Sequence, residues 1–217
     1  VFAAARRAEE AAYREAQRLR NEFLVRLKEF RVLDPACGSG NFLYVALKAL
    51  KDIEHRANID AETLGLDKAT PAVGPENVLG IDAAKNPILR PLDTIECRDA
   101  VLNADGTRAE WPEADAVVGN PPFLGNKKMI RELGEDYTRT LRNSWPEVPG
   151  GVDLVCYWFA KAWAMMAAGR LHRAGLVSTN SIRGGVNREV LKPIVDGGRI
   201  LEAWSDEGWT VEGAAVR

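Results

Sequence analysis

The sequence contains few residues of the kinds that build metal sites or disulfide frameworks, and it has no long apolar run. Its 217 residues include only two histidines and three cysteines, Cys37, Cys97 and Cys156. The cysteines form no Cys-x-x-Cys pair, which argues against a zinc site and favours a reducing, cytoplasmic setting. No apolar stretch approaches the roughly 20 residues that cross a bilayer, and nothing resembles a signal peptide. From these absences we expect the protein to bind no metal ion and to have no membrane partner.

The sequence also lacks an excess of positive charge. Its formal net charge is −2, whereas a domain that binds nucleic acid over much of its surface is usually basic. A nucleic-acid partner would therefore be held by local patches, or by a surface outside this chain. What the sequence does contain is 46% hydrophobic and 28% charged residues, which is typical of one soluble globular domain with a sizeable core.

The two ends of the chain predict that it is a fragment. Residues 1–30 carry Leu19, Phe23 and Leu27 at helical spacing with charged residues between them, which predicts an amphipathic helix that serves as a connector. The chain begins inside this pattern. It ends at Arg217, just after an apolar Gly-Ala-Ala-Val that reads as the beginning of a strand. We therefore expect a helical connector over 1–30 and a second domain over 31–217 whose last strand is truncated.

After residue 30, short apolar segments alternate with helical patterns. This alternation predicts an α/β fold with a mainly parallel, doubly wound sheet, and places ligands at the carboxyl ends of its strands. Only eleven residues, including Pro87 and Pro91, separate the second strand from the third, so one crossover helix is predicted to be missing. The predicted strands are 31–34, 77–82, 94–100, 114–120, 175–181 and 199–205; the predicted helices are 42–53, 129–142, 153–166 and 188–195.

The first predicted strand ends in a glycine-rich turn, Asp-Pro-Ala-Cys-Gly-Ser-Gly-Asn-Phe over 34–42. Gly38 and Gly40 let the backbone turn tightly and approach a ligand before a helix begins near Asn41. A dinucleotide fingerprint would have a third glycine where Leu43 stands, and the Gly-Lys-Ser/Thr of a P-loop is absent. The turn therefore predicts a small-molecule site of another kind.

Three aspartates narrow the choice of ligand. Asp34, Asp82 and Asp99 each fall at the carboxyl end of a predicted strand, so they are expected to converge on one crevice. Carboxylates would repel a pyrophosphate but suit a ligand with a cationic centre, ribose hydroxyls and an exocyclic amine. S-adenosylmethionine has all of these groups. The alternative is that each aspartate is an ordinary turn or cap residue.

A second motif, Gly-Asn-Pro-Pro-Phe over 119–123, follows the fourth predicted strand. Its two prolines fix the backbone and remove two N–H donors. The Asn120 side-chain oxygen and the Pro121 carbonyl can then accept hydrogen bonds from a planar NH2 group, and Phe123 can stack on a base taken out of a helix. Methyl transfer to such an amine depends on positioning rather than on a covalent nucleophile. Cys37 is therefore interpreted as a packing residue.

With both motifs placed, the sequence resembles the adenine-N6 DNA methyltransferases of the MmeI-like branch, in which restriction and modification share one polypeptide. DPACGSGNF looks like their cofactor motif and NPPF like their catalytic motif. The similarity extends to GNPPFLGNKKM, VPGGVDLVCYWFAKA, GLVSTNSIRGGVNREVL and EAWSDEGWTVEGAAVR. It runs from about Val32 to Arg217.

The resemblance implies a Rossmann-like S-adenosylmethionine-dependent methyltransferase domain over 31–217, acting as a site-specific adenine methyltransferase on double-stranded DNA. It also implies nuclease and target-recognition domains elsewhere in the full-length protein, where the main DNA surface would lie. Asp82 would bind the ribose hydroxyls and Asp99 the adenine amine. The methionine end of the cofactor would contact Asp34, Ala36, Gly38, Gly40 and Phe42, and the target base would contact Asn120, Pro121, Pro122 and Phe123.

Two alternatives remain open from the sequence. The same acceptors suit cytosine-N4, RNA and protein-glutamine methylation, and the short crossover is compatible with a decayed or truncated scaffold that no longer catalyses. Lys127, Lys128 and Arg131 would contact DNA phosphates or form a solvated helix start. Arg183 would border the base pocket or belong to a plain turn.

Overall fold

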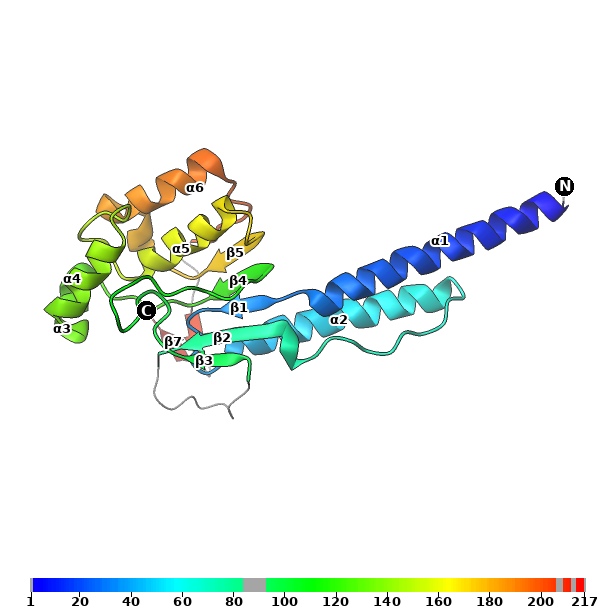
Figure 1. Ribbon diagram of the computed structural model, residues 1–217, viewed down its shortest axis with the longest axis horizontal. Helices are drawn as coiled ribbons and strands as arrows, with labels where there is room; N and C mark the ends of the chain where they lie inside the picture. Colours follow the sequence, from blue (N-terminus) through cyan, green and yellow to red (C-terminus); the bar gives the residue numbers. More distant parts are fainter. Residues whose placement is uncertain (1, 84–92, 206–208, 212–213, 217) are drawn as a thin grey trace. The chain divides into compact units, whose positions relative to one another are not determined.

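The computed structural model describes residues 2–83, 93–205, 209–211 and 214–216 (Figure 1). The predicted loss of a crossover helix falls mostly on 84–92, outside the described residues. The chain divides into two compact units, one made of residues 1–98 and 111–119 and the other of 99–110 and 120–217. Of the described helices, none combines the length and apolar character that crossing a bilayer requires.

A five-stranded sheet has the order β3-β2-β1-β4-β5. Strands β1 (Val32–Asp34), β2 (Val78–Asp82), β3 (Ile95–Cys97) and β4 (Ala116–Gly119) belong to the first unit. The pairs β1–β2, β1–β4 and β2–β3 are all parallel, with Val32 opposite both Val78 and Ala116. The predicted α/β fold with a mainly parallel sheet is confirmed.

The helices of the first unit explain its core. Helix α1 (Phe2–Glu29) lies beside α2 (Asn41–Thr63) in Figure 1, and α2 packs against β1 and β2. Leu27, Val32 and Leu50, from α1, β1 and α2, meet in one buried cluster. Of the apolar residues that the sequence predicted to pack, Leu27 is buried, whereas Leu19 is 53% and Phe23 42% exposed. The amphipathic pattern of α1 is therefore buried only around Leu27 in this chain.

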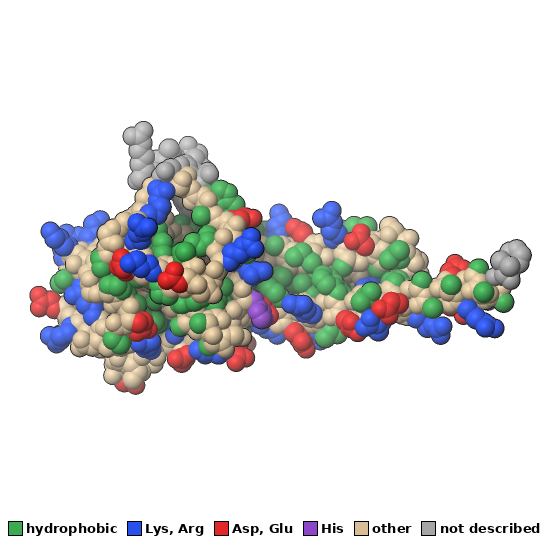
Figure 2. Space-filling view, turned by 90° about the horizontal axis from the view of Figure 1, so that it is seen from above, with side chains coloured by type: hydrophobic (Ala, Val, Ile, Leu, Met, Phe, Trp, Pro, Cys, Tyr) green, Lys and Arg blue, Asp and Glu red, His purple; other side chains and the backbone are tan. Residues whose placement is uncertain are grey.

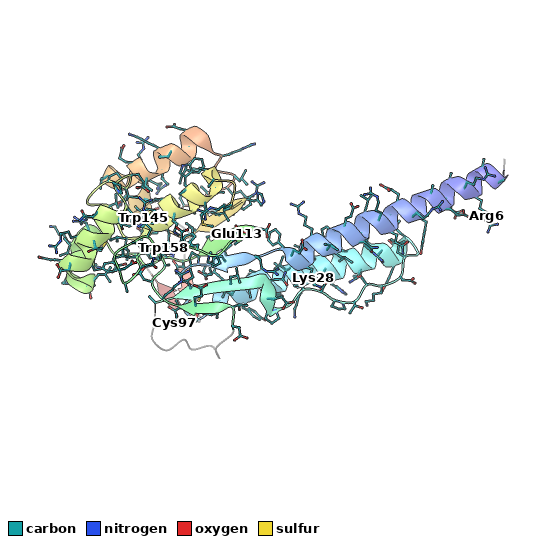
Figure 3. The ribbon with its side chains drawn as sticks, in the orientation of Figure 1. Arg6, Lys28, Cys97, Glu113, Trp145 and Trp158 are labelled. Atoms are coloured by element: carbon teal, nitrogen blue, oxygen red, sulfur yellow. The ribbon has the colours of Figure 1, made fainter. Side chains whose placement is uncertain are left out.

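The second unit contains α3 (Asn126–Leu133), α4 (Glu135–Ser144), α5 (Val155–Ala167) and α6 (Lys192–Gly197). It also contains β5 (Arg173–Leu176), the 3-10 turns η2 (Asn180–Arg183) and η3 (Gly185–Leu191), and an antiparallel pair formed by β6 (Trp209–Val211) and β7 (Ala214–Val216). Trp145, labelled in Figure 3, is buried in this unit and meets Tyr157 edge-on, with 6.1 Å between ring centroids. Tyr157 and Trp158 of α5 are both buried and contribute to the core of this unit.

Four predicted elements of the second unit differ from the structure. The helix expected over 188–195 is a 3-10 turn up to Leu191 and an α-helix only from Lys192 to Gly197. The helix expected over 129–142 is two helices, because Gly134 has a φ of +89° and ends α3. The strand expected over 175–181 lies earlier, at Arg173–Leu176, and residues 180–183 form a 3-10 turn. The prediction of a strand over 199–205 is wrong. This segment forms no helix or strand, and its residues, including Trp204, are exposed.

Asn77 connects the end of α1 to the beginning of β2. Its Nδ2 group donates to the carbonyls of Leu27, Lys28 and Phe30 at 3.1, 3.1 and 2.8 Å. Its Oδ1 accepts the Gly74 N–H at 2.9 Å, and the side chain is fully buried. These carbonyls lie at the carboxyl end of α1, where a helix has no partners of its own for its last C=O groups.

We expect Asn77→Ala to lower the free energy of unfolding by about 2–4 kcal/mol, because it removes four hydrogen bonds made by one fully buried amide. Urea denaturation of wild type and variant measures this change. Asn21→Ala, which removes an exposed asparagine of α1, is the matched control. A loss for Asn77→Ala no larger than that of the control would contradict the capping role.

Candidate functional site

The turn after β1 is formed by two glycines in the left-handed region. Gly38 has a φ of +47° and Gly40 a φ of +77°, conformations that strain residues with a side chain. Gly40 N–H donates to the Cys37 carbonyl at 2.7 Å, and Cys37 N–H donates to the Ile81 carbonyl of β2 at 3.0 Å. A Cβ on Gly38 would meet nothing within 4 Å. The turn is thus fixed to the sheet and leaves open space at Gly38, as predicted for a ligand-binding turn.

Asp34, the last residue of β1, has a fully buried carboxylate. Its Oδ1 accepts the Ala36 N–H at 3.0 Å, whereas Oδ2 is buried without a hydrogen-bond partner among the described residues. Burial is the main reason that the pKa of Asp34 is raised to about 6; the Ala36 N–H opposes this rise, and the nearby charge of Asp82 adds to it. A buried carboxylate with an unpartnered oxygen is costly unless a donor or cation meets it.

Two close approaches explain why small residues stand around Asp34. A Cβ on Gly119, at the end of β4, would lie 2.8 Å from Asp34 Oδ1. A Cβ on Gly80 of β2 would lie 2.9 Å from Cys37 Sγ. Cys37 is buried, and burial, followed by the charges of Asp34 and Asp82, raises the pKa of its thiol to about 12. Cys37 is thus buried and contacts small neighbours, as a packing residue does.

The three predicted aspartates are divided between the units. Asp34 and Asp82 belong to the first, and they are close enough for Asp82 to raise the pKa of Asp34. Asp82 ends β2, and its carbonyl accepts the Arg98 N–H at 3.0 Å. Asp99 belongs to the second unit. Its Oδ1 accepts the N–H groups of residues 101 and 102, so Asp99 has the turn role that the sequence left open as the alternative.

The residues of the Asn-Pro-Pro-Phe motif begin the second large segment of the second unit. Asn120 Oδ1 is buried and has no hydrogen-bond partner within the described part of the chain. Pro121 is buried, while Pro122 is exposed and the ring of Phe123 is 40% exposed. The motif therefore combines a buried acceptor without a donor and an aromatic ring that a ligand can reach.

A pocket of about 500 Å³ opens beside Phe123. Lys127 and Lys128, in the first turn of α3, line this pocket, and that turn contains no acidic residue of its own. On the face of the molecule that Figure 2 shows, Lys and Arg side chains are interspersed with Asp and Glu side chains. The pocket is lined by Phe123, Gly125, Asn126, Lys127, Lys128, Asp153 and Thr179.

One wall of this pocket is held by a polar cluster that was not predicted from the sequence. Asp153 Oδ2 accepts the Ser181 hydroxyl at 2.7 Å and the Asn187 Nδ2 group at 2.9 Å. Asn187 Oδ1 in turn accepts the Asp153 N–H at 2.8 Å. The only local signal was an aspartate before an apolar helix, which is typical of a helix start. Arg183 donates to Asn180 within the same turn, which favours its turn role.

The residues present fit S-adenosylmethionine as a ligand. The first unit offers a buried carboxylate oxygen without a donor at Asp34, a second carboxylate at Asp82, and open backbone at Gly38. Such a set suits a ligand that carries both cationic groups and hydroxyls. Among the described residues, no group of His, Cys, Asp or Glu side chains is arranged to hold a metal ion.

Comparison with known proteins places the chain in a family. The family model "MmeI, DNA-methyltransferase domain" matches residues 8–89 and 92–215. DNA methyltransferase A of Bacillus subtilis (strain 168) is 28% identical over 218 residues, which cover 83% of this chain and 24% of that protein. The chain therefore spans about a quarter of the length of this relative.

A solved structure shares the fold. The type IIL restriction-modification enzyme MmeI, solved in complex with DNA, matches with a TM-score of 0.55 and 21% identity, over 86% of this chain and 29% of that one. The predicted Rossmann-like methyltransferase fold is thereby confirmed. The family match begins at residue 8, inside the helix that the sequence analysis separates as a connector.

The raised pKa of Asp34 predicts a pH dependence of stability. Between the ordinary pKa of about 4 and the folded value, the native state retains a proton that the unfolded chain has lost, so stability falls as pH rises through this range. Asp34→Asn cannot ionise and keeps an oxygen for the Ala36 N–H. We expect its free energy of unfolding, relative to wild type, to increase by about 1–3 kcal/mol from about pH 4 to about pH 7.5.

Urea denaturation at both pH values measures this difference. Asp136→Asn, which removes an exposed carboxylate of α4, controls for the loss of one charge. A difference between Asp34→Asn and wild type that does not change with pH would show that Asp34 has the same affinity for protons in the folded and unfolded chain.

Proposed function

Because the chain belongs to the MmeI DNA-methyltransferase domain family, we propose that it is the catalytic core of a site-specific, adenine-specific DNA methyltransferase. Its reaction would move a methyl group from S-adenosylmethionine to the exocyclic amine of an adenine taken out of the DNA helix. The core would be the modification part of a restriction-modification enzyme. The observation that carries the proposal is the buried Oδ1 of Asn120, which has no donor among the described residues, in the same loop as the exposed ring of Phe123.

Asn120 and Pro121 would hold the target amine. An adenine amine has two N–H donors, and a side-chain amide oxygen with a backbone carbonyl offers two acceptors. The prolines at 121 and 122 keep the loop from supplying competing N–H donors. Phe123, which lines the pocket and is reachable by a ligand, would stack on the flipped base. Burial of Asn120 Oδ1 strengthens this recognition, because water does not compete for the oxygen.

Most of the predicted cofactor-binding residues belong to the first unit, and Asp99 belongs to the second. Asp34 and the glycine turn, with Ala36 and Phe42, would bind the methionine end of the cofactor, Asp82 its ribose hydroxyls and Asp99 its adenine amine. When bound, S-adenosylmethionine supplies an electrophilic methyl group. The chain has no need of a covalent nucleophile, and the buried, high-pKa thiol of Cys37 is unsuited to be one.

The same acceptors would suit cytosine-N4, RNA or protein-glutamine amines, and a catalytically decayed scaffold would keep the fold without the transfer. Incubating the full-length protein with labelled cofactor and each substrate class separates these alternatives. Adenine methylation in double-stranded DNA is the result that we expect. Labelled methyl groups on cytosine, RNA or protein would support methylation of that substrate instead. Labelling of no substrate would support the decayed scaffold.

Removing the side-chain acceptor should abolish the reaction and spare cofactor binding. We expect Asn120→Ala in the full-length enzyme to lower the methylation rate by roughly 100-fold or more, as the loss of a buried, preorganised polar contact does in other active sites. Transfer of labelled methyl groups to DNA measures the rate. Asn143→Ala, at an exposed position of α4, is the control. Unchanged methylation by Asn120→Ala would refute the assigned role.

The two lysines on the pocket rim should contact DNA phosphates. We expect the Lys127→Ala, Lys128→Ala double variant to weaken DNA binding by the full-length protein on all sequences alike. The slope of log affinity against log salt concentration should become shallower by roughly 2. Titrations at several salt concentrations measure the slope. The control is Lys48→Ala with Lys51→Ala, both exposed on α2; an equal change in this control would exclude a specific phosphate contact.

A further inference from the structure

Tyr137, in the first turn of α4, is bonded to the aspartate assigned to the cofactor's adenine. Its hydroxyl donates to Asp99 Oδ2 at 2.6 Å. The other oxygen, Oδ1, accepts the N–H groups of Val101 at 2.8 Å and Leu102 at 3.1 Å. These three donors fix both the position and the plane of the carboxylate. Burial, and then the hydrogen bond to Asp99, raise the pKa of the Tyr137 phenol above its ordinary range, so it stays a donor at neutral pH.

Helix α4 holds the whole segment that carries Asp99. At its amino end Tyr137 reaches Asp99, and just beyond its carboxyl end the Trp145 indole N–H donates to the Val101 carbonyl at 3.3 Å. Arg108 donates to the Ser144 carbonyl and forms a bidentate pair with Glu147 at 2.7 and 2.6 Å. Because Trp145 is almost fully buried, α4 is a rigid support for residues 99–108.

The orientation of a carboxylate matters for recognising an exocyclic amine. An amine N–H needs an acceptor that lies close to the plane of its ring, and a carboxylate oxygen can accept more than one hydrogen bond. The two backbone N–H groups hold only one oxygen of the Asp99 carboxylate, so small rotations about the Cβ–Cγ bond are still limited from one side alone. The Tyr137 hydroxyl restrains these rotations, since it bonds the oxygen at the opposite end.

We propose that Tyr137 is a positioning residue for cofactor recognition, whose hydroxyl holds Asp99 Oδ2 in the orientation that accepts a hydrogen bond from the adenine amine of S-adenosylmethionine. The inference rests on the proposed function and on the role of Asp99 within it. Its consequence is selectivity. The Tyr137 hydroxyl favours a 6-amino purine on the cofactor and contributes nothing to binding a cofactor that lacks this amine.

The test compares two unreactive ligands by calorimetry on the full-length protein: S-adenosylhomocysteine, and S-inosylhomocysteine, in which an oxygen replaces the amine. We expect Tyr137→Phe to weaken binding of the adenosyl ligand about 5-fold, as the loss of a hydrogen bond to a charged group does. Binding of the inosyl ligand should stay within about 2-fold of wild type. Tyr13→Phe, which removes an exposed phenol of α1, is the matched control and should change neither.

A second variant makes the result specific to Asp99. Asp99→Asn keeps one oxygen for Val101 and Leu102 but places an NH2 group in the position of Oδ2. In that background Tyr137→Phe should cause no further loss for the adenosyl ligand. The stoichiometry of each titration reports the folded fraction, so a less stable variant is still interpretable.

Three outcomes would overturn the inference: an equal loss for both ligands, no loss, or tighter binding by Tyr137→Phe, which would mean that the phenol competes with the amine. If the wild type methylates adenine while Tyr137→Phe shows no selective loss, the proposed function stands and only this inference fails. If the folded wild type binds neither ligand, both fail.

Discussion

The buried carboxylate of Asp34 is the constraint around which the first unit is arranged. It ends the central strand β1, accepts the Ala36 N–H that begins the glycine turn, and leaves no space for a side chain at position 119. Its second oxygen has no donor among the described residues. A fold that keeps such a group accepts an energetic cost in the free protein, and a cationic ligand would remove that cost on binding.

In the second unit, hydrogen bonds hold short polar segments in fixed positions. Helix α4 fixes residues 99–108 through Tyr137 and Trp145, and the cluster of Asp153, Ser181 and Asn187 fixes the turn that borders the pocket. Only Gly134 separates α4 from α3, so one helix pair carries both the residue that orients Asp99 and the lysines of the pocket rim. Binding residues on such rigid elements are more precisely placed than residues on free loops.

Much of this could be predicted from the sequence, because its strongest signals are local. Apolar segments followed by aspartate or glycine predicted the first four strands, and Gly38 and Gly40 predicted the turn. Long-range contacts were not predictable: nothing adjacent to Tyr137 indicates Asp99 as its partner, 38 residues away. The strand expected over 199–205 failed for the same reason, because apolar content forms a strand only where a neighbour pairs with it. The pairing of Asp153 with Asn187 likewise exists only in the folded chain.

Asn77 gives α1 a mechanical property. It binds three carbonyls at the carboxyl end of that helix and lies one residue before β2. A helix rises about 1.5 Å per residue, so the 28 residues of α1 extend over roughly 42 Å. One end of this length is tied by a single buried amide to the residue before β2, the strand that ends in Asp82. Asn77 therefore couples the placement of a long helix to the placement of a candidate cofactor-binding strand.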